Sequence, residues 1–283
     1  MSSIPTIVAY GLREALRRKV FVVVLLLTLG FLFLFWLGNH YAFRDLADVG
    51  PPPGIDARSF AGAFVFGLAM FATLFLGVVL AVFLTLGVVR GDAERGLLQP
   101  LIVRPIGRTT LLVARWLGAV AVCLPYVGLV YVATMLITGL TGHWWPDHKV
   151  VPGLELAGGV ALVAALSLLG SVFLSATANG IAIFMVFGAG LVAGLLGTIG
   201  HALSSHPLER AAKIAAWLVP FEGLYQDALR GITAETHGLT GFLLDLGPFG
   251  GAYTGGIWLR LWTLAYFAVV ACAAAIGFAR RDL

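Results

Sequence analysis

The chain has 283 residues, of which 60% are hydrophobic and 11% charged, and its mean hydropathy is +0.97. Because a soluble domain averages about 25% charged residues, this composition excludes a water-soluble protein and predicts one whose main solvent is lipid. The net charge of +4 comes from basic residues dispersed along the sequence, without the basic face that nucleic-acid binding requires.

The first 19 residues predict an amphipathic helix. Its apolar residues recur at helical spacing, while arginines occupy the other faces, and Ser3 with Pro5 suits its first turn. We expect residues 1–19 to lie along the cytoplasmic leaflet as an interfacial elbow helix; a cytoplasmic extension of the first span is the alternative. The uncharged run that follows, 20–37, is longer than the apolar core of a signal peptide, about 7–15 residues, so a retained span is expected.

Six segments are apolar over the length of about 20 residues that a helix needs to cross the hydrocarbon core. They are 20–38, 60–89, 111–140, 154–174, 181–199 and 258–279. Only SATANG, residues 175–180, separates the fourth from the fifth, which is typical of a tight hairpin. The sequence therefore predicts an all-α integral membrane protein whose residues 1–283 form a single transmembrane domain.

The basic residues predict the orientation of these spans. With a cytoplasmic N-terminus, the inner side receives eleven of the 18 Lys and Arg residues: Arg13, Arg17, Arg18, Lys19, Arg90, Arg95, Arg104, Arg108, Arg115, Arg280 and Arg281. Since cytoplasmic loops carry the excess of Lys and Arg, both termini are expected in the cytoplasm. We expect the protein in the inner or plasma membrane.

The segment 201–256 is the longest stretch outside the spans, and on this orientation it is extracytoplasmic. Pro207 and Pro220 each suit an early helical position, and apolar residues after Pro220 share one face. Two short amphipathic helices are expected here, bent at Pro220 and half sunk in the outer leaflet. Gly-rich patches at 158–170 and 188–200 allow close helix approach, and dimer contact and packing within one chain are equally good uses of them.

Motifs for chemistry are scarce. The sequence has no nucleotide-binding P-loop, no HExxH and no GxSxG, and the two cysteines in apolar runs indicate no disulfide framework or metal site. The group His201, Ser204, Ser205 and His206 could combine a nucleophile with its base, but a helix cap in an outer loop explains the same residues and is the favoured interpretation. Within the spans we expect two charged residues, Arg115 and Arg260, each close to an interface. We expect no carboxylate there that would bind a coupling ion.

The polar segment 91–108 between the second and third spans is the strongest candidate site. Asp92 can cap a short helix that Pro100 limits, and Pro105 holds Arg104 in an extended conformation. Such a helix exposes leucines beside arginines on the cytoplasmic surface. Periodicity alone favours docking of a partner and leucines lying back on the bilayer equally.

This segment resembles the coupling-helix signature of ABC-2 type transporter permeases: E-x-G-T-L, a pair of leucines, P-[VI]-x-R and L-x-x-[KR]. The matching residues here are Glu94, Gly96, Leu97, Leu98, Pro105, Ile106, Gly107, Arg108, Leu111, Leu112 and Arg115. Leu97 stands where the family commonly has Thr, and Gln99 with Pro100 replaces a plain helical pair, which implies a shorter or kinked coupling helix. The elbow helix, six spans and the helices around Pro220 resemble the same family.

The resemblance implies an exporter permease that is not itself an enzyme. Two permease subunits would pair in the membrane and bind two cytoplasmic ABC ATPase subunits, which would hold the ATP and Mg, so this chain would bind no cofactor. The implied ATPase contacts are Asp92, Glu94, Arg95, Leu97, Leu98, Leu101 and Arg108, with Arg13 and Arg17 in support.

Two other functional classes stay open at this point. One is a membrane-embedded lipid-modifying enzyme that uses His201, Ser204, His206 or the outer Glu222 and Asp227. The other is a non-transporting membrane anchor or regulator of an ATPase, which needs the same docking helix. Lipid, drug, peptide, polysaccharide and metal-maturation cargoes all occur with this architecture.

Overall fold

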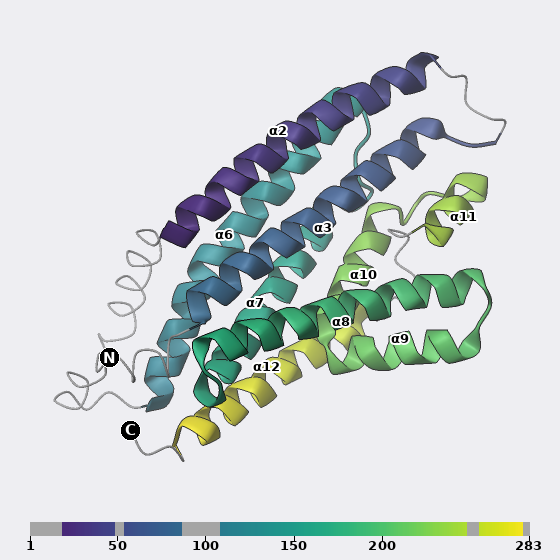
Figure 1. The fold of residues 1–283 in the computed structure, drawn as a ribbon. Coiled ribbons are helices and arrows are strands. Elements are labelled where there is room, and N and C mark those ends of the chain that lie inside the picture. The colour runs from purple at the N-terminus through teal and green to yellow at the C-terminus, as the bar shows by residue number, and fades with distance from the viewer. Residues whose placement is uncertain (1–18, 49–53, 87–107, 248–254, 280–283) are drawn as a thin grey trace.

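The computed structural model describes residues 19–48, 54–86, 108–247 and 255–279, and all of its regular structure in these ranges is helical (Figure 1). Nine helices lie in the described ranges. They are α2 (Lys19–Asp48), α3 (Ala57–Thr85), α6 (Arg108–Gly142), α7 (Val151–Phe173), α8 (Ala176–Ala202), α9 (His206–Leu218), α10 (Pro220–Ile232), α11 (Gly238–Leu246) and α12 (Gly256–Ala279).

Six of these helices, α2, α3, α6, α7, α8 and α12, are long and apolar enough to cross a membrane. They correspond one to one with the six predicted spans, so the prediction of a multi-pass all-α membrane protein is confirmed. The predicted elbow helix, 1–19, lies outside the described residues except for its last position, and the predicted coupling helix, in 91–108, lies outside them except for Arg108.

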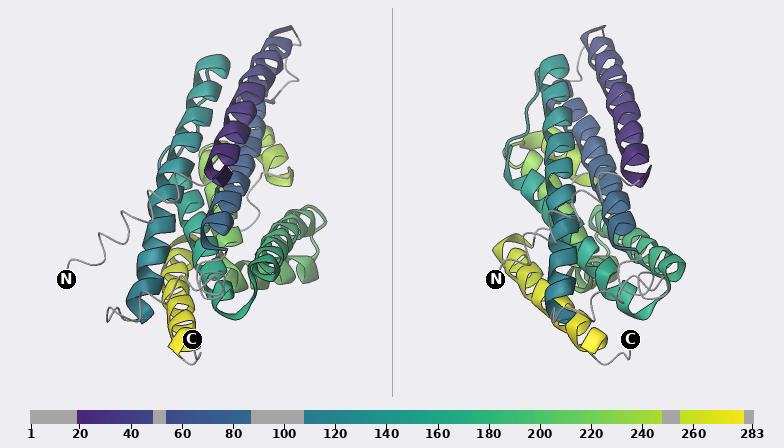
Figure 2. Two further views of the ribbon diagram at one scale, coloured as in Figure 1. Left: turned by 60° about the vertical axis from the view of Figure 1, so that its left-hand side comes forward. Right: turned by 90° about the vertical axis from the view of Figure 1, so that its left-hand side faces the viewer.

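The spans run in alternating directions between two ends of the bundle. We call one the Arg108 end, where α3 finishes and α6 starts, and the other the Gly142 end, where α6 finishes and α7 starts. Gly142 is in close contact with the Phe43 ring near the end of α2. In both views of Figure 2, α12 (yellow) lies against α6 (teal), where Leu112 packs with Ala274 and Phe278 at the Arg108 end.

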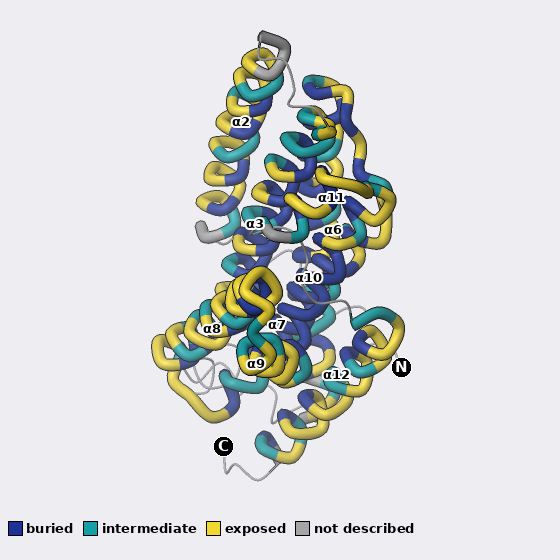
Figure 3. Tube along the Cα trace, turned by 90° about the vertical axis from the view of Figure 1, so that its right-hand side faces the viewer, coloured by how far each residue is buried: buried dark blue, intermediate teal, exposed yellow. Residues whose placement is uncertain are grey.

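Helices α3 and α7 are the central spans. In each of them 67% of the most apolar stretch is buried, against 17% for α2 and 22% for α12, and Figure 3 shows many exposed residues on α2, α8, α9 and α12. The carboxylate of Asp56 caps α3 by accepting from the backbone N–H groups of Arg58 and Ser59. The Ser59 hydroxyl also donates to it and lowers the pKa of Asp56.

The predicted hairpin at 175–180 joins α7 to α8. Ser175 is the N-cap of α8, and Asn179 donates from its side-chain amide to the Ser167 carbonyl of α7 at 2.8 Å. Gly170 of α7 lies directly against the Asn179 side chain, where any larger residue would collide. The small polar residues of this turn therefore join two spans that contain no charge at this end.

Helices α9 and α10 form a hairpin that folds back into the bundle, and we call it the α9–α10 hairpin. Helix α9 packs antiparallel to α8, and α10 then runs antiparallel to the first half of α7 (Figure 1). Gly200 of α8 meets α9 near its start, whereas Gly190 meets Phe221 at the start of α10. These ten residues of α8 correspond to about 15 Å, so the bend at Pro220 reaches about midway along α8.

The burial of α10 corrects the prediction that both short helices lie half sunk in the lipid. Helix α9 is amphipathic as expected, with Ala212 and Ala216 buried. In α10, however, every residue from Pro220 to Leu229 is buried, including the polar face (Figure 3). Protein surrounds α10 because α7, α8, α9, α12 and α3 all contact it. Helix α11, in the same segment, was not anticipated.

The glycines of α8 decide between the two uses left open for the patch 188–200. Added Cβ atoms at Gly190, Gly194 and Gly197 would meet Phe221, Glu222 and Ala212 of the α9–α10 hairpin. These glycines therefore serve packing within one chain. Gly188, by contrast, has nothing within 4 Å of such an atom.

Candidate functional site

The structure bears only indirectly on the predicted ATPase contacts. Arg108 is the first residue of α6. The other contacts lie outside the described residues: Arg13, Arg17, Asp92, Glu94, Arg95, Leu97, Leu98 and Leu101. What the structure does describe is the pair of helices that this segment joins.

Helices α3 and α6 connect that segment to the centre of the protein. Gly77 of α3 lies between Val127 of α6 and Val160 of α7, where an added Cβ would come within 2.9 Å of each. At the last residue of α3, the buried Thr85 hydroxyl donates to the Ser167 hydroxyl of α7 at 2.8 Å. Such close packing makes α3, α6 and α7 move together, since tightly packed interiors transmit displacement.

A cluster of charged side chains lies where α7, α10 and α12 meet, toward the Gly142 end. We call Glu155, Asp227 and Arg260 the charge cluster. Arg260 donates from Nε to Glu155 Oε1 at 2.9 Å and from Nη2 to Asp227 Oδ2 at 3.3 Å. Its Nη2 also forms a salt bridge with Glu155 Oε1, at 2.7 Å. Both carboxylates are over 90% buried, whereas Arg260 is 44% exposed.

The charge cluster binds three helices that are far apart in the sequence. Arg260 contacts a carboxylate 105 residues earlier and another 33 residues earlier. Removing one member of a buried ion pair costs about 3–5 kcal/mol, mainly because the remaining charge is left without a partner. The cluster therefore makes the position of α10 depend on both α7 and α12.

Glu222 lies one turn and a half before Asp227 on α10 and is 1% exposed. Its Oε1 accepts from the Gln226 amide at 2.7 Å and sits against Gly194 of α8, in space that any side chain there would fill. Burial raises the pKa of Glu222 to about 8, and the Gln226 amide, which favours the charged form, offsets part of that rise. The same burial, together with the charge of Glu222, raises the pKa of the Tyr225 hydroxyl.

The sequence prediction that the membrane part of the chain contains no carboxylate is wrong. Glu155 is the fifth residue of α7 and is buried, so it belongs to the span, and Asp227 and Glu222 reach the interior on the returning helix α10. Arg260, expected to reach the interface alone, is paired with two of them. The sequence did contain a signal for this pairing. Glu155 and Arg260 have opposite charges, and each lies about one turn inside its span at the same end of the bundle.

The structure separates the residues considered for an enzymatic site. His201 and His206 flank Glu209, each with Nδ1 3.8 Å from a carboxylate oxygen, on the exposed turn between α8 and α9. Glu222 and Asp227 are buried on α10 instead. Ser205 occupies the N-cap position of α9 but makes no capping hydrogen bond with its side chain. The two sets therefore do not form one site.

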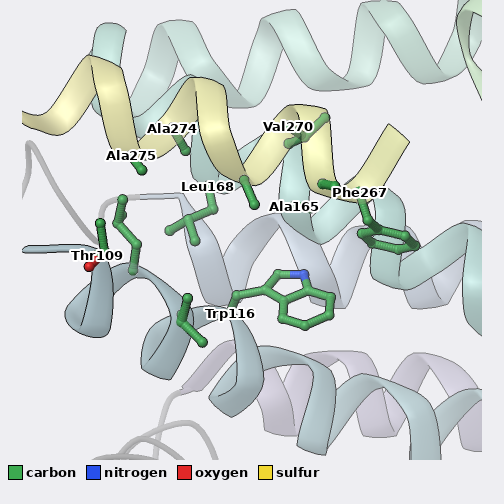
Figure 4. A pocket seen from close by; sticks show the side chains of 12 residues that line it. Thr109, Trp116, Ala165, Leu168, Phe267, Val270, Ala274 and Ala275 are labelled. Carbon is green, nitrogen blue, oxygen red and sulfur yellow. The ribbon is translucent and has the colours of Figure 1, made fainter. Parts of the chain in front are cut away.

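An apolar pocket of about 310 Å³ opens between α6, α7 and α12 near the Arg108 end (Figure 4). Trp116 and Phe267 meet edge to face at one end of it, with ring centroids 5.6 Å apart, and alanines of α12 form one wall. Trp116 Nε1 donates to the Ala161 carbonyl at 3.3 Å, so its polar atom is satisfied. The pocket suits a hydrocarbon group, which is the chemistry of the surrounding lipid.

Among the described residues, no group of three or more His, Cys, Asp or Glu side chains is arranged to hold a metal ion. The free thiols are Cys123, buried in the core, and Cys272, exposed on α12. No family model matches the sequence, and a search of curated proteins finds no significant match.

Proposed function

We propose that this chain is the membrane subunit of an ATP-driven exporter of the ABC-2 type. The observation that carries the proposal is the position of the motif at residues 94–115, which begins after the end of α3 and runs into the first turns of α6. Two copies would pair in the membrane and bind two cytoplasmic ATPase subunits that supply ATP and Mg. The termini and the motif would face the cytoplasm, as the distribution of Lys and Arg indicates.

The packing of α3 supports a mechanical role for this motif. A force applied between α3 and α6 acts on α3, one of the two most buried spans, and, through Gly77 and Thr85, on α7, the other. Helix α7 is in turn connected to α10 and α12, because Arg260 of α12 pairs with both Glu155 of α7 and Asp227 of α10. Closure of the ATPase pair would then favour one of two packings of the membrane helices, which is how differential binding drives a conformational switch.

Co-purification with the ATPase tests the proposal. The gene of the partner is expected beside this one, and the two proteins are expressed together. Reversing the charges of Glu94 and Arg95, or the substitution Leu98→Asp, is expected to abolish co-purification while the permease stays in the membrane. The charge reversal Arg210→Glu, on the exposed face of α9, is the matched control and is expected to leave the complex intact. Normal complexes from the Glu94, Arg95 and Leu98 variants would contradict the proposal.

The same material separates the two other functional classes. A lipid-modifying enzyme would turn over lipid without the ATPase and would lose activity with His206→Ala. An anchor or regulator would bind the ATPase through the same residues but would move no cargo in ATP-loaded vesicles. ATP-dependent export that requires both proteins is the result expected for a permease.

A further inference from the structure

The charge cluster has one cation for two carboxylates. Glu155 and Asp227 both form their salt bridges with Arg260, and both with the same nitrogen, Nη2. The two carboxyl groups also interact directly with each other. With all three groups ionised, the cluster carries one uncompensated negative charge in an interior that penalises it.

The elements around α10 bring no second cation to this charge. Helix α7 contributes Glu155 and α12 contributes Arg260, while α6 contributes the Tyr131 hydroxyl, which interacts with Glu155. Helix α8 contains no Lys, Arg, Asp or Glu, and α9 presents alanines on its buried face. On α10 itself, Glu222 and Tyr225 add no positive charge, and Arg230 pairs with Asp245 of α11. Arg58 of α3 is exposed, as is His148 in the turn before α7, which contacts α10 through its backbone.

The hydrogen bonds of Glu155 indicate what balances the charge. Its Oε1 accepts a hydrogen bond from Arg260 Nε and forms a salt bridge with Nη2, but its Oε2 is buried and has no hydrogen-bond partner. An ionised carboxylate can only accept, whereas a protonated one can also donate. A single proton held between the two carboxyl groups would make the cluster neutral and would supply the missing donor. Carboxyl pairs that share a proton titrate as a unit.

We propose that Glu155 and Asp227 form a proton-binding site that holds one proton between them at neutral pH, and that this proton locks α10 against α7 and α12. When the proton leaves, an O–H bond breaks, the proton passes to water at the exposed side of Arg260, and both carboxylates are ionised. Their repulsion then acts between α7 and α10. The end of α10 is also held by backbone hydrogen bonds that Asp147 and His148 donate to Ile232 and Gly231. The loosening is therefore expected in the part of α10 before these bonds, from Pro220 to Leu229.

Infrared spectroscopy of the purified full chain in lipid nanodiscs tests the proton directly, because the carbonyl stretch of a protonated carboxyl group is distinct from that of a carboxylate. The substitution Glu222→Gln provides the background, because burial raises the pKa of Glu222 to about 8 and its own proton would add to the signal near neutral pH. In this background we expect one protonated carboxyl group at pH 7. Adding Asp227→Asn or Glu155→Gln is expected to abolish it, because the remaining carboxylate then pairs one to one with Arg260. Adding Glu209→Gln, a partly exposed carboxylate on α9, is expected to leave it unchanged.

Hydrogen exchange of the α10 backbone amides tests the lock. After correction for intrinsic exchange rates, protection of α10 is expected to fall by up to about tenfold for each pH unit above the pH at which the infrared band is lost. Both proteins carry Glu222→Gln, because Glu222 lies on α10 and its pKa is raised to about 8. When Asp227→Asn is added to that background, the protection is expected to be independent of pH over the same range. This variant keeps the Glu155–Arg260 pair, so its fold is not put at risk.

Two results would overturn the inference. Absence of the band in Glu222→Gln at pH 7, or its persistence in both added variants, would show that the pair holds no proton. A band that titrates while α10 protection stays constant would show that the proton does not lock the hairpin. The inference goes beyond the proposed function, because neither measurement requires an ATPase or transport.

Discussion

Replacement of Glu222 by Gln is expected to change how the stability of this protein depends on pH. Glu222 is fully buried, and its pKa lies near 8 in the folded protein against 4.5 for an ordinary glutamate. The folded state keeps its proton throughout this window, whereas the unfolded chain loses it near pH 4.5. The free energy of unfolding therefore falls as the pH rises from about 4.5 to 8 and is constant, for this group, above that.

The size of the effect follows from the difference between the two pKa values. A rise from 4.5 to about 8 corresponds to about 5 kcal/mol between the acidic and basic ends of the window. At roughly 2 °C per kcal/mol for a large domain, the melting temperature would change by about 10 °C. Glutamine is neutral at every pH and fits the same space against Gly194, so Glu222→Gln is expected to lose this contribution.

Thermal unfolding in detergent at pH 5, 7 and 9 measures the difference. The two proteins are expected to melt at similar temperatures at pH 5, and Glu222→Gln is expected to be the more stable at pH 9. Glu209→Gln, which removes a partly exposed carboxylate from α9, is the control and should follow the parent protein. Parallel pH profiles for the parent and Glu222→Gln would refute the reasoning, because they would mean that Glu222 is solvated or paired with a cation.

Three further perturbations have defined outcomes. Arg260→Gln leaves Glu155 and Asp227 without a cation and should lower the free energy of unfolding by about 3–5 kcal/mol at pH 7. Adding Glu155→Gln should restore part of the lost stability. A denaturant titration that finds no loss for Arg260→Gln would contradict the role of the ion pairs. Gly194→Ala places a methyl group against Glu222 and should cost about 1–3 kcal/mol and expose the α9–α10 hairpin to protease, whereas Gly188→Ala, on the same helix but in open space, should do neither. Thr85→Val removes the buried hydrogen bond to Ser167 and should lower stability by about 1 kcal/mol, as measured by the shift in melting temperature.

The spans could be predicted from the sequence because lipid imposes a simple rule on each of them. A helix that faces hydrocarbon must be apolar over its whole length, and the boundaries of α7 and α8 followed from the polar SATANG turn. This rule is local, and no other helix is needed to apply it. The agreement between the predicted and observed spans depends on that independence.

The charge cluster could not be predicted in the same way because it depends on which helices meet. Glu155 alone is a polar residue near the end of a span, and Asp227 alone is an acid on a short amphipathic helix. Only the return of α10 along α7 brings them to one guanidinium. The periodicity of α10 indicated an apolar face, but burial of its polar face depends on the glycines of α8, which remove the side chains that would otherwise keep α10 away.

The buried position of α10 also constrains the order in which this protein is made. Helix α10 carries Glu222 and Asp227, and it lacks the apolar length to enter the bilayer by itself. The guanidinium that Asp227 pairs with is synthesised 33 residues later, in α12. The last contact of the charge cluster can therefore form only after α12 has been synthesised. A chain truncated before α12 would contain five of the six spans and both carboxylates of the cluster, but not the cation that compensates them.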